Sequence, residues 1–311
     1  MLTTAVVLER PEHLVLSRLA LPEPADSDVV VDMLWSGIST GTERLLWSGR
    51  MPPFPGLGYP LVPGYESVGR VCAAGDTSGK TVGDLVFVPG ARCYGEVRGL
   101  FGGSASKVVV PGAKVTRLNS SVAEEGVLFA LAATAHHAVA AGKAPELIVG
   151  HGVLGRLVAR VCIALGANVP VVWETNPERR DGADGYAVVD PADDPRRDYA
   201  VICDVSGDAR LVDSLIARLA PQGEIVLAGF YSEPISFAFP PAFMREARLR
   251  IAAEWREADL VAVCDLVESH KLSLNGLITH RAGAGDAERA YRTAFGDPAC
   301  LKMILDWSAL S

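Results

Sequence analysis

The residues best suited to chemistry form a glycine-rich turn in the middle of the chain. Gly150, Gly152 and Gly155 follow the GxGxxG order, directly after the apolar string ELIVG and before the apolar string LVARVCIAL. One glycine makes the tight bend, the next lets the backbone approach a pyrophosphate, and the third lets strand and helix pack closely. The first N–H groups of the helix then face the phosphates. A dinucleotide site is therefore predicted, with a tight turn in another α/β protein as the alternative; its turn residues are Gly150, Gly152, Val153, Leu154 and Gly155.

An acidic residue completes this pattern and bears on which dinucleotide binds. Glu174 closes the apolar string VPVVWE, 19 residues after Gly155, where an acidic side chain accepts hydrogen bonds from the ribose hydroxyls. Its charge would repel the 2′-phosphate of NADP and so favours NAD, whereas Arg179 and Arg180 could instead serve such a phosphate. Two further positions after apolar strings are assigned to the same predicted site: Ser206 and Gly229.

Two adjacent histidines offer an acid–base candidate on residue type alone. His136 and His137 lie in the Ala-rich string FALAATAHHAVAAGKA, which is typical of a helix, and imidazole titrates near neutral pH. Because neighbours on a helix point about 100° apart, we expect only one of the two to face inward. A structural role is the alternative for either. His151, inside the glycine turn, is expected to point to solvent or to pack locally.

Two regions with different sequence patterns contain these residues. Residues 1–112 consist of short Val-rich strings separated by Pro, Gly, Asp and Ser, which predicts a β-rich region. Within it, the Pro- and Gly-rich stretch 47–65 predicts a rigid apolar loop. From residue 120 onward, strand-like and helix-like strings alternate, which indicates a parallel sheet with crossover helices. A later helix is predicted for READLVAVCDLVESH, and a final strand for CLKMILDW.

Composition narrows the possible function classes. The chain has 311 residues, about two domains on average domain sizes, and 49% of them are apolar and 21% charged, as in folded soluble proteins. With 29 basic and 37 acidic residues the net charge is −8, and no run of Lys or Arg favours a nucleic-acid partner. No secretory signal or apolar run of 18 residues is present, which predicts a cytoplasmic protein. The six widely spaced cysteines indicate a reducing compartment.

The chain resembles the medium-chain dehydrogenase/reductase superfamily over nearly its whole length. SGISTGTE (36–43) and PLVPGYESVGRV (60–71) occupy the places of that superfamily's SGxCxTD and P…GHExxGxV segments. LITHRAGAGDAERAYRTAF…CLKMIL is similar to its C-terminal segment. The resemblance implies an α/β protein of two domains: a GroES-like β-rich catalytic domain formed by 1–125 and 265–311, and a Rossmann doubly wound parallel-sheet domain formed by 126–264.

Three longer strings are similar to the bacteriochlorophyllide a dehydrogenase branch of this superfamily. They are WSGISTGTERLLWSGRMPPFPGLGYPLVPGYESVGRV, ARCYGEVRGLFGG, and PELIVGHGVLGRL followed by VWETNPERR. This resemblance implies NAD-dependent oxidation of the 3-(1-hydroxyethyl) group of a chlorophyllide or bacteriochlorophyllide to 3-acetyl, in bacteriochlorophyll a biosynthesis. It implies a Mg-tetrapyrrole substrate, and leaves open a homodimer and a peripheral contact with a membrane or with pigment-pathway enzymes.

The sequence differs from the zinc-dependent members of the superfamily at the positions that bind the catalytic zinc. Ser39 and Tyr65 stand where zinc-dependent relatives carry Cys and His, and the third ligand position falls in FALAAT, which offers no thiol. The four-cysteine structural zinc lobe is missing too, since Cys93 is the only cysteine of its region. Because zinc needs three protein ligands, we predict no metal. The alternatives are a zinc-independent NADPH-dependent quinone or double-bond reductase and a non-catalytic dinucleotide-binding protein.

Alcohol oxidation without zinc needs positioned hydroxyl groups and a base. The two segments that face the nicotinamide in the superfamily give Tyr65 and Glu66 as the proton-handling pair, with Ser39 and Thr42 as hydroxyl relay groups. An aromatic wall and a structural carboxylate are the alternative roles for Tyr65 and Glu66. Other side chains could flank a flat ring or meet its propionate: Trp35, Trp47, Phe54, Tyr59 and Phe101, and Arg50, Arg92 and Arg98.

Overall fold

The computed structural model describes residues 1–310, and the chain divides into two compact units. The first unit comprises Met1–Ala130 and Leu277–Ser311, and the second comprises Leu131–Gly276. The predicted boundaries at 125 and 264 lie somewhat earlier than these divisions. The later one would cut through helix α6 (Glu257–Glu268), which stays whole in the second unit.

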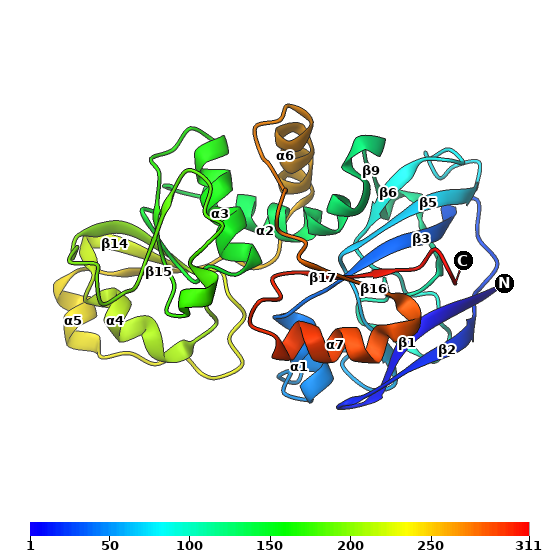
Figure 1. Ribbon diagram of the computed structural model, residues 1–311, viewed down its shortest axis with the longest axis horizontal. Helices are drawn as coiled ribbons and strands as arrows, with labels where there is room; N and C mark the ends of the chain where they lie inside the picture. Colours follow the sequence, from blue (N-terminus) through cyan, green and yellow to red (C-terminus); the bar gives the residue numbers. More distant parts are fainter. Residues whose placement is uncertain (311) are drawn as a thin grey trace. The chain divides into compact units, whose positions relative to one another are not determined.

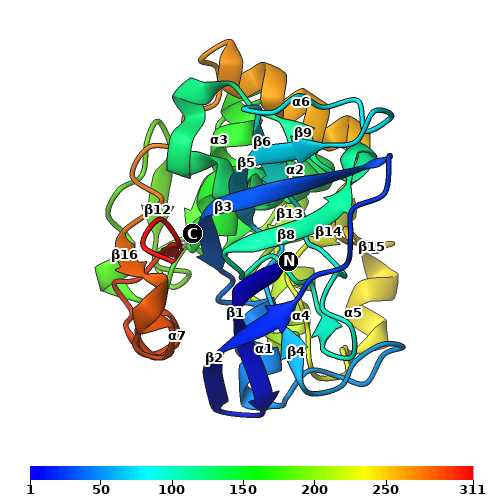
Figure 2. The same ribbon diagram turned by 90° about the vertical axis from the view of Figure 1, so that its right-hand side faces the viewer.

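The first unit is built on two β-sheets. A seven-stranded sheet has the order β16-β17-β3-β5-β6-β9, with β8 also paired to β3, and a four-stranded sheet has the order β2-β1-β4-β7. Figure 2 shows β3 between β5 and β8. The strands are β1 (Leu2–Arg10), β2 (His13–Ala20), β3 (Asp28–Ile38), β4 (Leu61–Val62), β5 (Ser67–Ala74), β6 (Leu85–Val88), β7 (Arg98–Gly99), β8 (Lys107–Pro111), β9 (Thr116–Arg117), β16 (His280–Gly283) and β17 (Met303–Asp306).

The last strand explains why this unit contains both ends of the chain. β17 pairs antiparallel with β3, so that Met303 lies opposite Ile38 and Asp306 opposite Trp35. Its apolar residues are buried in the core of the first unit, and the final strand predicted for CLKMILDW is therefore confirmed. Directly after it, the fully buried Trp307 donates its indole N–H to the Ser36 hydroxyl at 2.9 Å.

Helix α1 (Thr42–Ser48) is a helix that the sequence patterns did not predict. The predicted loop begins at Trp47, whereas α1 continues to Ser48 and ends at Gly49, whose φ of 69° is left-handed. Glycine adopts this conformation without a Cβ penalty, and the Gly49 N–H caps the helix end. The remaining helices of the unit are η1 (Gly112–Lys114), η2 (Ser120–Leu128), η5 (Ala284–Asp286) and α7 (Ala287–Gly296).

The second unit is a doubly wound α/β structure. Its six strands are all parallel, in the order β12-β11-β10-β13-β14-β15, and Figure 1 shows α3 and α4 on opposite sides of this sheet. The predicted alternation of strands and helices is confirmed. The strands are β10 (Leu147–Val149), β11 (Val171–Trp173), β12 (Ala187–Val189), β13 (Tyr199–Asp204), β14 (Leu219–Leu227) and β15 (Arg248–Ile251). The helices are α2 (Phe129–Ala140), α3 (Val153–Ala164), η3 (Pro177–Arg179), η4 (Ala209–Leu211), α4 (Val212–Ile216), α5 (Phe239–Met244) and α6.

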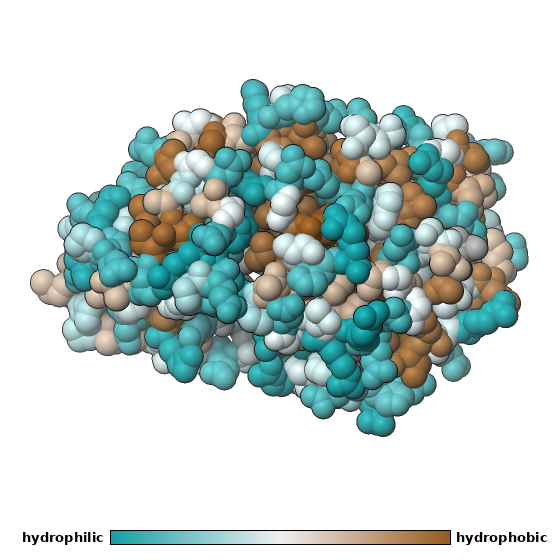
Figure 3. Space-filling view, in the orientation of Figure 1, coloured by the Kyte–Doolittle hydropathy of each residue, from teal (hydrophilic) through white to brown (hydrophobic). Residues whose placement is uncertain are grey.

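The strand order fixes where a ligand binds in such a sheet. From β10 successive strands are added on one side (β11, β12) and from β13 on the other (β14, β15), and ligands of open α/β sheets bind beyond the carboxyl ends of the strands where this order changes sides. On the face shown in Figure 3, hydrophobic side chains form small patches divided by hydrophilic ones. Within residues 1–310, no helix has the length and apolar character needed to cross a membrane.

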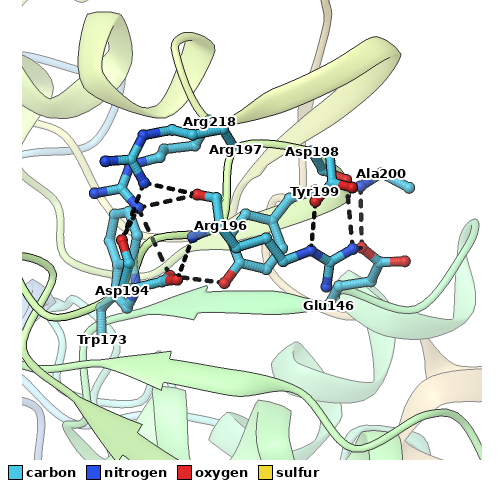
Figure 4. Close-up of polar contacts among 9 residues, drawn as sticks. All are labelled: Glu146, Trp173, Asp194, Arg196, Arg197, Asp198, Tyr199, Ala200 and Arg218. Atoms are coloured by element: carbon cyan, nitrogen blue, oxygen red, sulfur yellow. Dashed lines mark hydrogen bonds and ion pairs between the residues drawn. The ribbon is translucent and has the colours of Figure 1, made fainter.

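A buried carboxylate, Asp194, fixes the end of strand β11 in the second unit. Trp173 Nε1 and the Tyr199 hydroxyl each donate to Asp194 Oδ2 at 2.7 Å, and the Arg196 N–H donates to Oδ1 at 2.9 Å (Figure 4). The Arg218 guanidinium lies 3.8 Å from the same carboxylate. Burial alone would raise the pKa of Asp194, but these hydrogen bonds lower it overall. Because Trp173 ends β11, the network holds in place the strand that leads to Glu174.

Replacing Asp194 by alanine is expected to destabilise the protein by roughly 2–4 kcal/mol, because the indole and phenol donors lose a buried charged acceptor. Chemical unfolding at pH 7 measures this loss. Asp198→Ala is the matched control, since the Asp198 side chain is 76% exposed and its ion pair with Arg196 contributes little. Since the pKa of Asp194 is lowered in the folded state, its stabilisation is lost as the pH falls through that pKa. Equal unfolding midpoints for the two variants would contradict the role of Asp194.

Candidate active site

The glycine turn after β10 has the geometry of a phosphate cradle. Gly150 has a left-handed φ of 106°, and Gly152 precedes α3 with open space where a Cβ would lie. A Cβ on Gly155 would meet the Gly150 carbonyl oxygen at 1.9 Å, so that only glycine allows this packing. No side chain caps the N-terminus of α3 at Gly152, which leaves its first N–H groups available to an anion. The residues present therefore fit a dinucleotide pyrophosphate; the buried Val153 and half-buried Leu154 form the first turn of α3.

The predicted acidic residue lies beside this turn. Glu174 Oε2 accepts the His151 N–H at 3.1 Å, and Glu174 Oε1 accepts the Asn176 N–H at 2.8 Å. Each carboxylate oxygen retains a second lone pair for a hydroxyl donor. Arg180, one of the two nearby cations, contacts the Asp190 carboxylate and donates to the Glu174 carbonyl oxygen.

His151 is fully buried, so the expectation that it faces solvent is wrong and the alternative of local packing holds. Its Nδ1 lies 2.6 Å from the Arg179 carbonyl oxygen, and its Nε2 lies 2.8 Å from the Tyr186 hydroxyl. Burial lowers the pKa of His151 to about 4, which keeps the ring neutral at pH 7. The ring therefore joins the glycine turn to the segment after β11.

The structure brings the last two predicted cofactor residues together through Asp204. The Ser206 N–H donates to Asp204 Oδ1 at 2.8 Å, and the Gly229 N–H donates to the Asp204 carbonyl oxygen at 3.0 Å. Ser206 follows β13, which pairs with β10, and Gly229 follows β14, which pairs with β13. A Cβ on Gly229 would lie 2.8 Å from the Gly207 nitrogen, so this turn also requires glycine.

In the first unit, the predicted catalytic hydroxyls form one cluster at the junction of β3 and α1. Ser39 Oγ and the Tyr65 hydroxyl lie 2.8 Å apart, and the Thr42 N–H donates to Ser39 Oγ at 3.3 Å. The Phe101 ring packs edge-on against Tyr65, with centroids 5.3 Å apart. Burial and the neighbouring Glu66 charge raise the pKa of Tyr65 well above its ordinary value. Tyr65 is therefore a phenol, not a phenolate, at neutral pH.

Glu66 forms a buried ion pair that the sequence analysis missed. Lys302 Nζ lies 2.5 Å from Glu66 Oε2 and donates to the Ile38 carbonyl oxygen at 3.2 Å. The two side chains are 0% and 2% exposed. Across the described residues 1–310, Glu66 Oε1 has no hydrogen-bond partner. A single lysine inside the apolar string CLKMIL was the available signal, because a buried cation needs a counter-ion.

A second buried carboxyl group, Glu43 on α1, was also missed. The Tyr291 hydroxyl of α7 donates to Glu43 Oε2 at 2.5 Å, whereas Oε1 has no partner in the part of the chain that the structure describes. Burial raises the pKa of Glu43 to about 8, against the opposing effect of the Tyr291 hydrogen bond; the charge of Glu66 adds to the rise. At pH 7 this carboxyl group is mostly protonated.

His136 and His137 both face one carboxylate, so the expectation that only one of them faces inward is wrong. Their Nδ1 atoms lie 2.8 Å and 2.9 Å from the two oxygens of Asp259, which also accepts the Arg256 N–H at the start of α6. One carboxylate with two oxygens can span neighbouring rings. The pair thus joins α2 to α6 within the second unit. This contact agrees with the alternative given for these histidines, a structural role.

The residues at the superfamily's metal positions do not fit zinc. Ser39 and Tyr65 offer hydroxyl groups that bond to each other, and zinc in proteins takes thiolate, imidazole or carboxylate ligands. Among residues 1–310, no group of three His, Cys, Asp or Glu side chains is placed to hold a metal ion. Cys93, the cysteine of this region, is buried in the apolar core.

Of the predicted aromatic and arginine residues, Trp47 and Arg50 line a common cavity on the first unit. Phe101 contacts Tyr65, whereas Arg98 lies against the carbonyl oxygen of Tyr59. Trp35 lies in β3 opposite Asp306 of β17. The structure does not gather the remaining predicted side chains at the hydroxyl cluster: Phe54 and Arg92 are exposed.

Comparisons with known proteins agree on a dehydrogenase fold. Residues 25–120 match the alcohol dehydrogenase GroES-like domain family. The chain is 57% identical to the 2-desacetyl-2-hydroxyethyl bacteriochlorophyllide A dehydrogenases of Cereibacter sphaeroides and Rhodobacter capsulatus, covering 99% and 98% of both chains. An alcohol dehydrogenase from Escherichia coli CFT073, complexed with NADH, superimposes with a TM-score of 0.83 at 21% identity, covering 98% of this chain and 99% of that one.

Replacing Glu43 by glutamine is expected to flatten the pH dependence of stability between about pH 4.5 and 8. In this window an unfolded Glu43 ionises, whereas the folded one keeps its proton because burial raises its pKa to about 8. Stability therefore falls as the pH rises, and the amide, which does not ionise, removes this contribution. Thermal unfolding at several pH values measures the slope. The control is Glu9→Gln, whose side chain is 52% exposed; an unchanged slope in Glu43→Gln would refute the assignment.

Proposed function

The chain belongs to the bacteriochlorophyllide a dehydrogenases of the medium-chain dehydrogenase/reductase superfamily, and from this we propose that it oxidises the 3-(1-hydroxyethyl) group of a bacteriochlorophyllide or chlorophyllide to 3-acetyl. The observation that carries this function is the 57% identity over 99% of both chains to a dehydrogenase named for this substrate. It is a CH–OH dehydrogenase acting in bacteriochlorophyll biosynthesis, and its substrate is a Mg-tetrapyrrole.

The second unit binds a nicotinamide dinucleotide, and we propose NAD. The glycine turn before α3 supports a bound pyrophosphate, and NADH is bound by the similarly folded dehydrogenase of E. coli. Glu174 supports NAD over NADP because its carboxylate lies beside the turn, whereas the Arg180 guanidinium is engaged by Asp190. When bound, the oxidised dinucleotide accepts the hydride that leaves the alcohol carbon.

Residues of the first unit handle the alcohol proton in this proposal. Tyr65 keeps its own proton at neutral pH and donates a hydrogen bond to the alcohol oxygen as negative charge develops on it. Ser39, 2.8 Å from the Tyr65 hydroxyl, accepts the proton of the alcohol and gives up its own, and Thr42 orients Ser39 through its N–H. The proton passes to the Glu66 carboxylate, whose Oε1 is unpartnered in the described chain. Lys302 holds Glu66 in place through its other oxygen.

The chemistry of the substrate is compatible with a reaction without zinc, which we also propose. Zinc normally stabilises the alkoxide of an alcohol substrate, and the hydroxyl cluster replaces that effect by hydrogen bonding. The alcohol carbon is attached directly to the macrocycle, whose π system spreads the positive charge that develops as hydride leaves. The protein therefore needs to supply less stabilisation than for a saturated alcohol.

Purified protein is expected to reduce NAD⁺ in the presence of 3-(1-hydroxyethyl) bacteriochlorophyllide a, followed by the absorbance of NADH. A strong chelator should leave the initial rate within about twofold, because the donor set at Ser39 and Tyr65 does not suit zinc. NADP⁺ should support a lower kcat/KM, since Glu174 repels the 2′-phosphate. Absence of turnover with both dinucleotides would contradict the function. Loss of activity on chelation that Zn²⁺ restores would contradict only the reaction without metal.

Tyr65→Phe is expected to lower kcat by tenfold or more, because the hydrogen bond to the developing alkoxide and the hydroxyl partner of Ser39 are lost. Tyr94→Phe is the matched control: the Tyr94 hydroxyl donates to the Gly102 carbonyl oxygen at 2.5 Å within the same unit. Its kcat should stay within about twofold of wild type. Steady-state kinetics with NAD⁺ checks both variants, and equal kcat values for them would remove Tyr65 from the reaction.

A further inference from the structure

A cavity of about 480 Å³ on the first unit lies between helices α1 and α7. The two helices contribute residues of the same kinds at the same spacing: Arg, then an aromatic residue three positions on, then a small residue four positions on. On α1 these are Arg44, Trp47 and Ser48, and on α7 they are Arg292, Phe295 and Gly296. Residues three and four apart share one helix face, so each helix presents one arginine and one aromatic ring to the cavity.

The inner faces of the same helices fix the width of the cavity. Glu43 of α1 and Tyr291 of α7 are fully buried and share a hydrogen bond of 2.5 Å. On the outer side, the rings of Trp47 and Phe295 lie 5.6 Å apart between centroids. The hydrogen bond ties one helix to the other, and the aromatic pair gives the cavity an apolar part of its lining.

The cavity is positively charged in a chain whose net charge is −8. Arg50 adds a third guanidinium, and Glu12 is the single acidic residue among those that line the cavity. The Arg44 guanidinium makes no hydrogen bond or ion pair with the rest of residues 1–310, and Arg292 pairs with Glu288 at 2.9 Å on the exposed surface, where such a pair contributes little. Figure 3 shows hydrophilic side chains over the outward face of α7. Both arginines are available to an anionic ligand.

Arginines over aromatic rings suit a carboxylate attached to a flat, apolar group. The planar guanidinium binds a carboxylate through two parallel hydrogen bonds, and aromatic rings pack against another π system. Helix α1 connects this cavity to the predicted catalytic hydroxyls: its first residue donates to Ser39 Oγ, Arg44 follows in its first turn, and Trp47 and Ser48 lie at its C-terminal end. Its seven residues span about 10 Å.

We propose that this cavity binds the propionate carboxylate of the tetrapyrrole substrate, so that Arg44 and Arg292 anchor the ring while its hydroxyethyl group reaches Ser39 and Tyr65. The inference rests on the proposed function, because the hydroxyethyl group and the propionate lie on different pyrrole rings of one rigid macrocycle. The cavity then favours a free acid over its ester, since only the acid presents a carboxylate.

The test compares two substrates on three proteins. The substrates are 3-(1-hydroxyethyl) bacteriochlorophyllide a as the free acid and as its propionate methyl ester. The proteins are wild type, the double variant Arg44→Gln/Arg292→Gln, and the control Arg289→Gln, whose exposed side chain on α7 pairs with Asp286 outside the cavity. Thermal unfolding of each protein confirms that the surface substitutions leave the fold intact.

In the double variant, KM for the free acid is expected to rise at least about tenfold, the effect of losing hydrogen bonds to a charged group. KM for the methyl ester, KM for NAD⁺ and kcat should stay within about twofold of wild type, as should every parameter of the control. Equal increases for acid and ester, or no increase for either, would overturn the proposal. A rise in KM for NAD⁺ alone would also overturn it, by assigning the cavity to the dinucleotide phosphates.

Direct binding separates this proposal from the proposed function. If wild type oxidises neither pigment, the function fails, but quenching of tryptophan fluorescence by bacteriochlorophyllide a still reports on the cavity. Tighter binding of the acid than of its ester, lost in the double variant and retained in Arg289→Gln, would support the carboxylate site. Indistinguishable binding of acid and ester by wild type would overturn it.

Discussion

The ammonium group of Lys302 and the carboxylate of Glu66 lie 2.5 Å apart in the interior of the first unit, with both side chains buried. Burying two charges is costly unless they are paired and hydrogen-bonded, so Lys302 and Glu66 must remain together. Lys302 also donates to the Ile38 carbonyl oxygen at the end of β3. The ion pair therefore joins the residue before β17 to the end of β3 and to the residue before β5.

The same interior explains the unusual state of Glu43. A second ionised carboxylate near Glu66 would leave one negative charge without a counter-ion, since Lys302 can neutralise only one of them. Burial and this repulsion together raise the pKa of Glu43 to about 8. At pH 7 the cluster is then one cation, one anion and one neutral acid, and the neutral acid is the group that ties α1 to α7 through Tyr291.

The residues of the predicted cofactor site lie close together in the sequence, so a local pattern could identify them. The contacts around the predicted catalytic residues come from distant parts of the chain. The glycine turn and Glu174 are separated by one helix and one strand, so a pattern within a single βαβ unit could place them. Glu66 and Lys302 are 236 residues apart, and no local pattern links them. The prediction that only one of His136 and His137 faces inward was wrong, because helix geometry predicts where a side chain points but not that a neighbouring helix supplies Asp259. Helix α1 was missed because its seven residues lie between a strand and a Pro-rich loop.

A reaction without a metal changes what the rest of the site must do. A bound metal ion orients the alcohol oxygen and stabilises its charge at one point, whereas in the proposed reaction the hydroxyl groups of Ser39 and Tyr65 would bind that oxygen only weakly in the ground state. The remaining orientation must come from binding energy elsewhere on the substrate, which holds the reacting carbon in place. In a flat, rigid macrocycle, contacts at one edge also fix the position of the opposite edge. Binding at the propionate edge can therefore orient the reacting carbon. A protein that lacks the metal would thus gain most from anchors away from the reacting carbon, and in this chain α1 begins at the hydroxyl cluster and lines the arginine cavity.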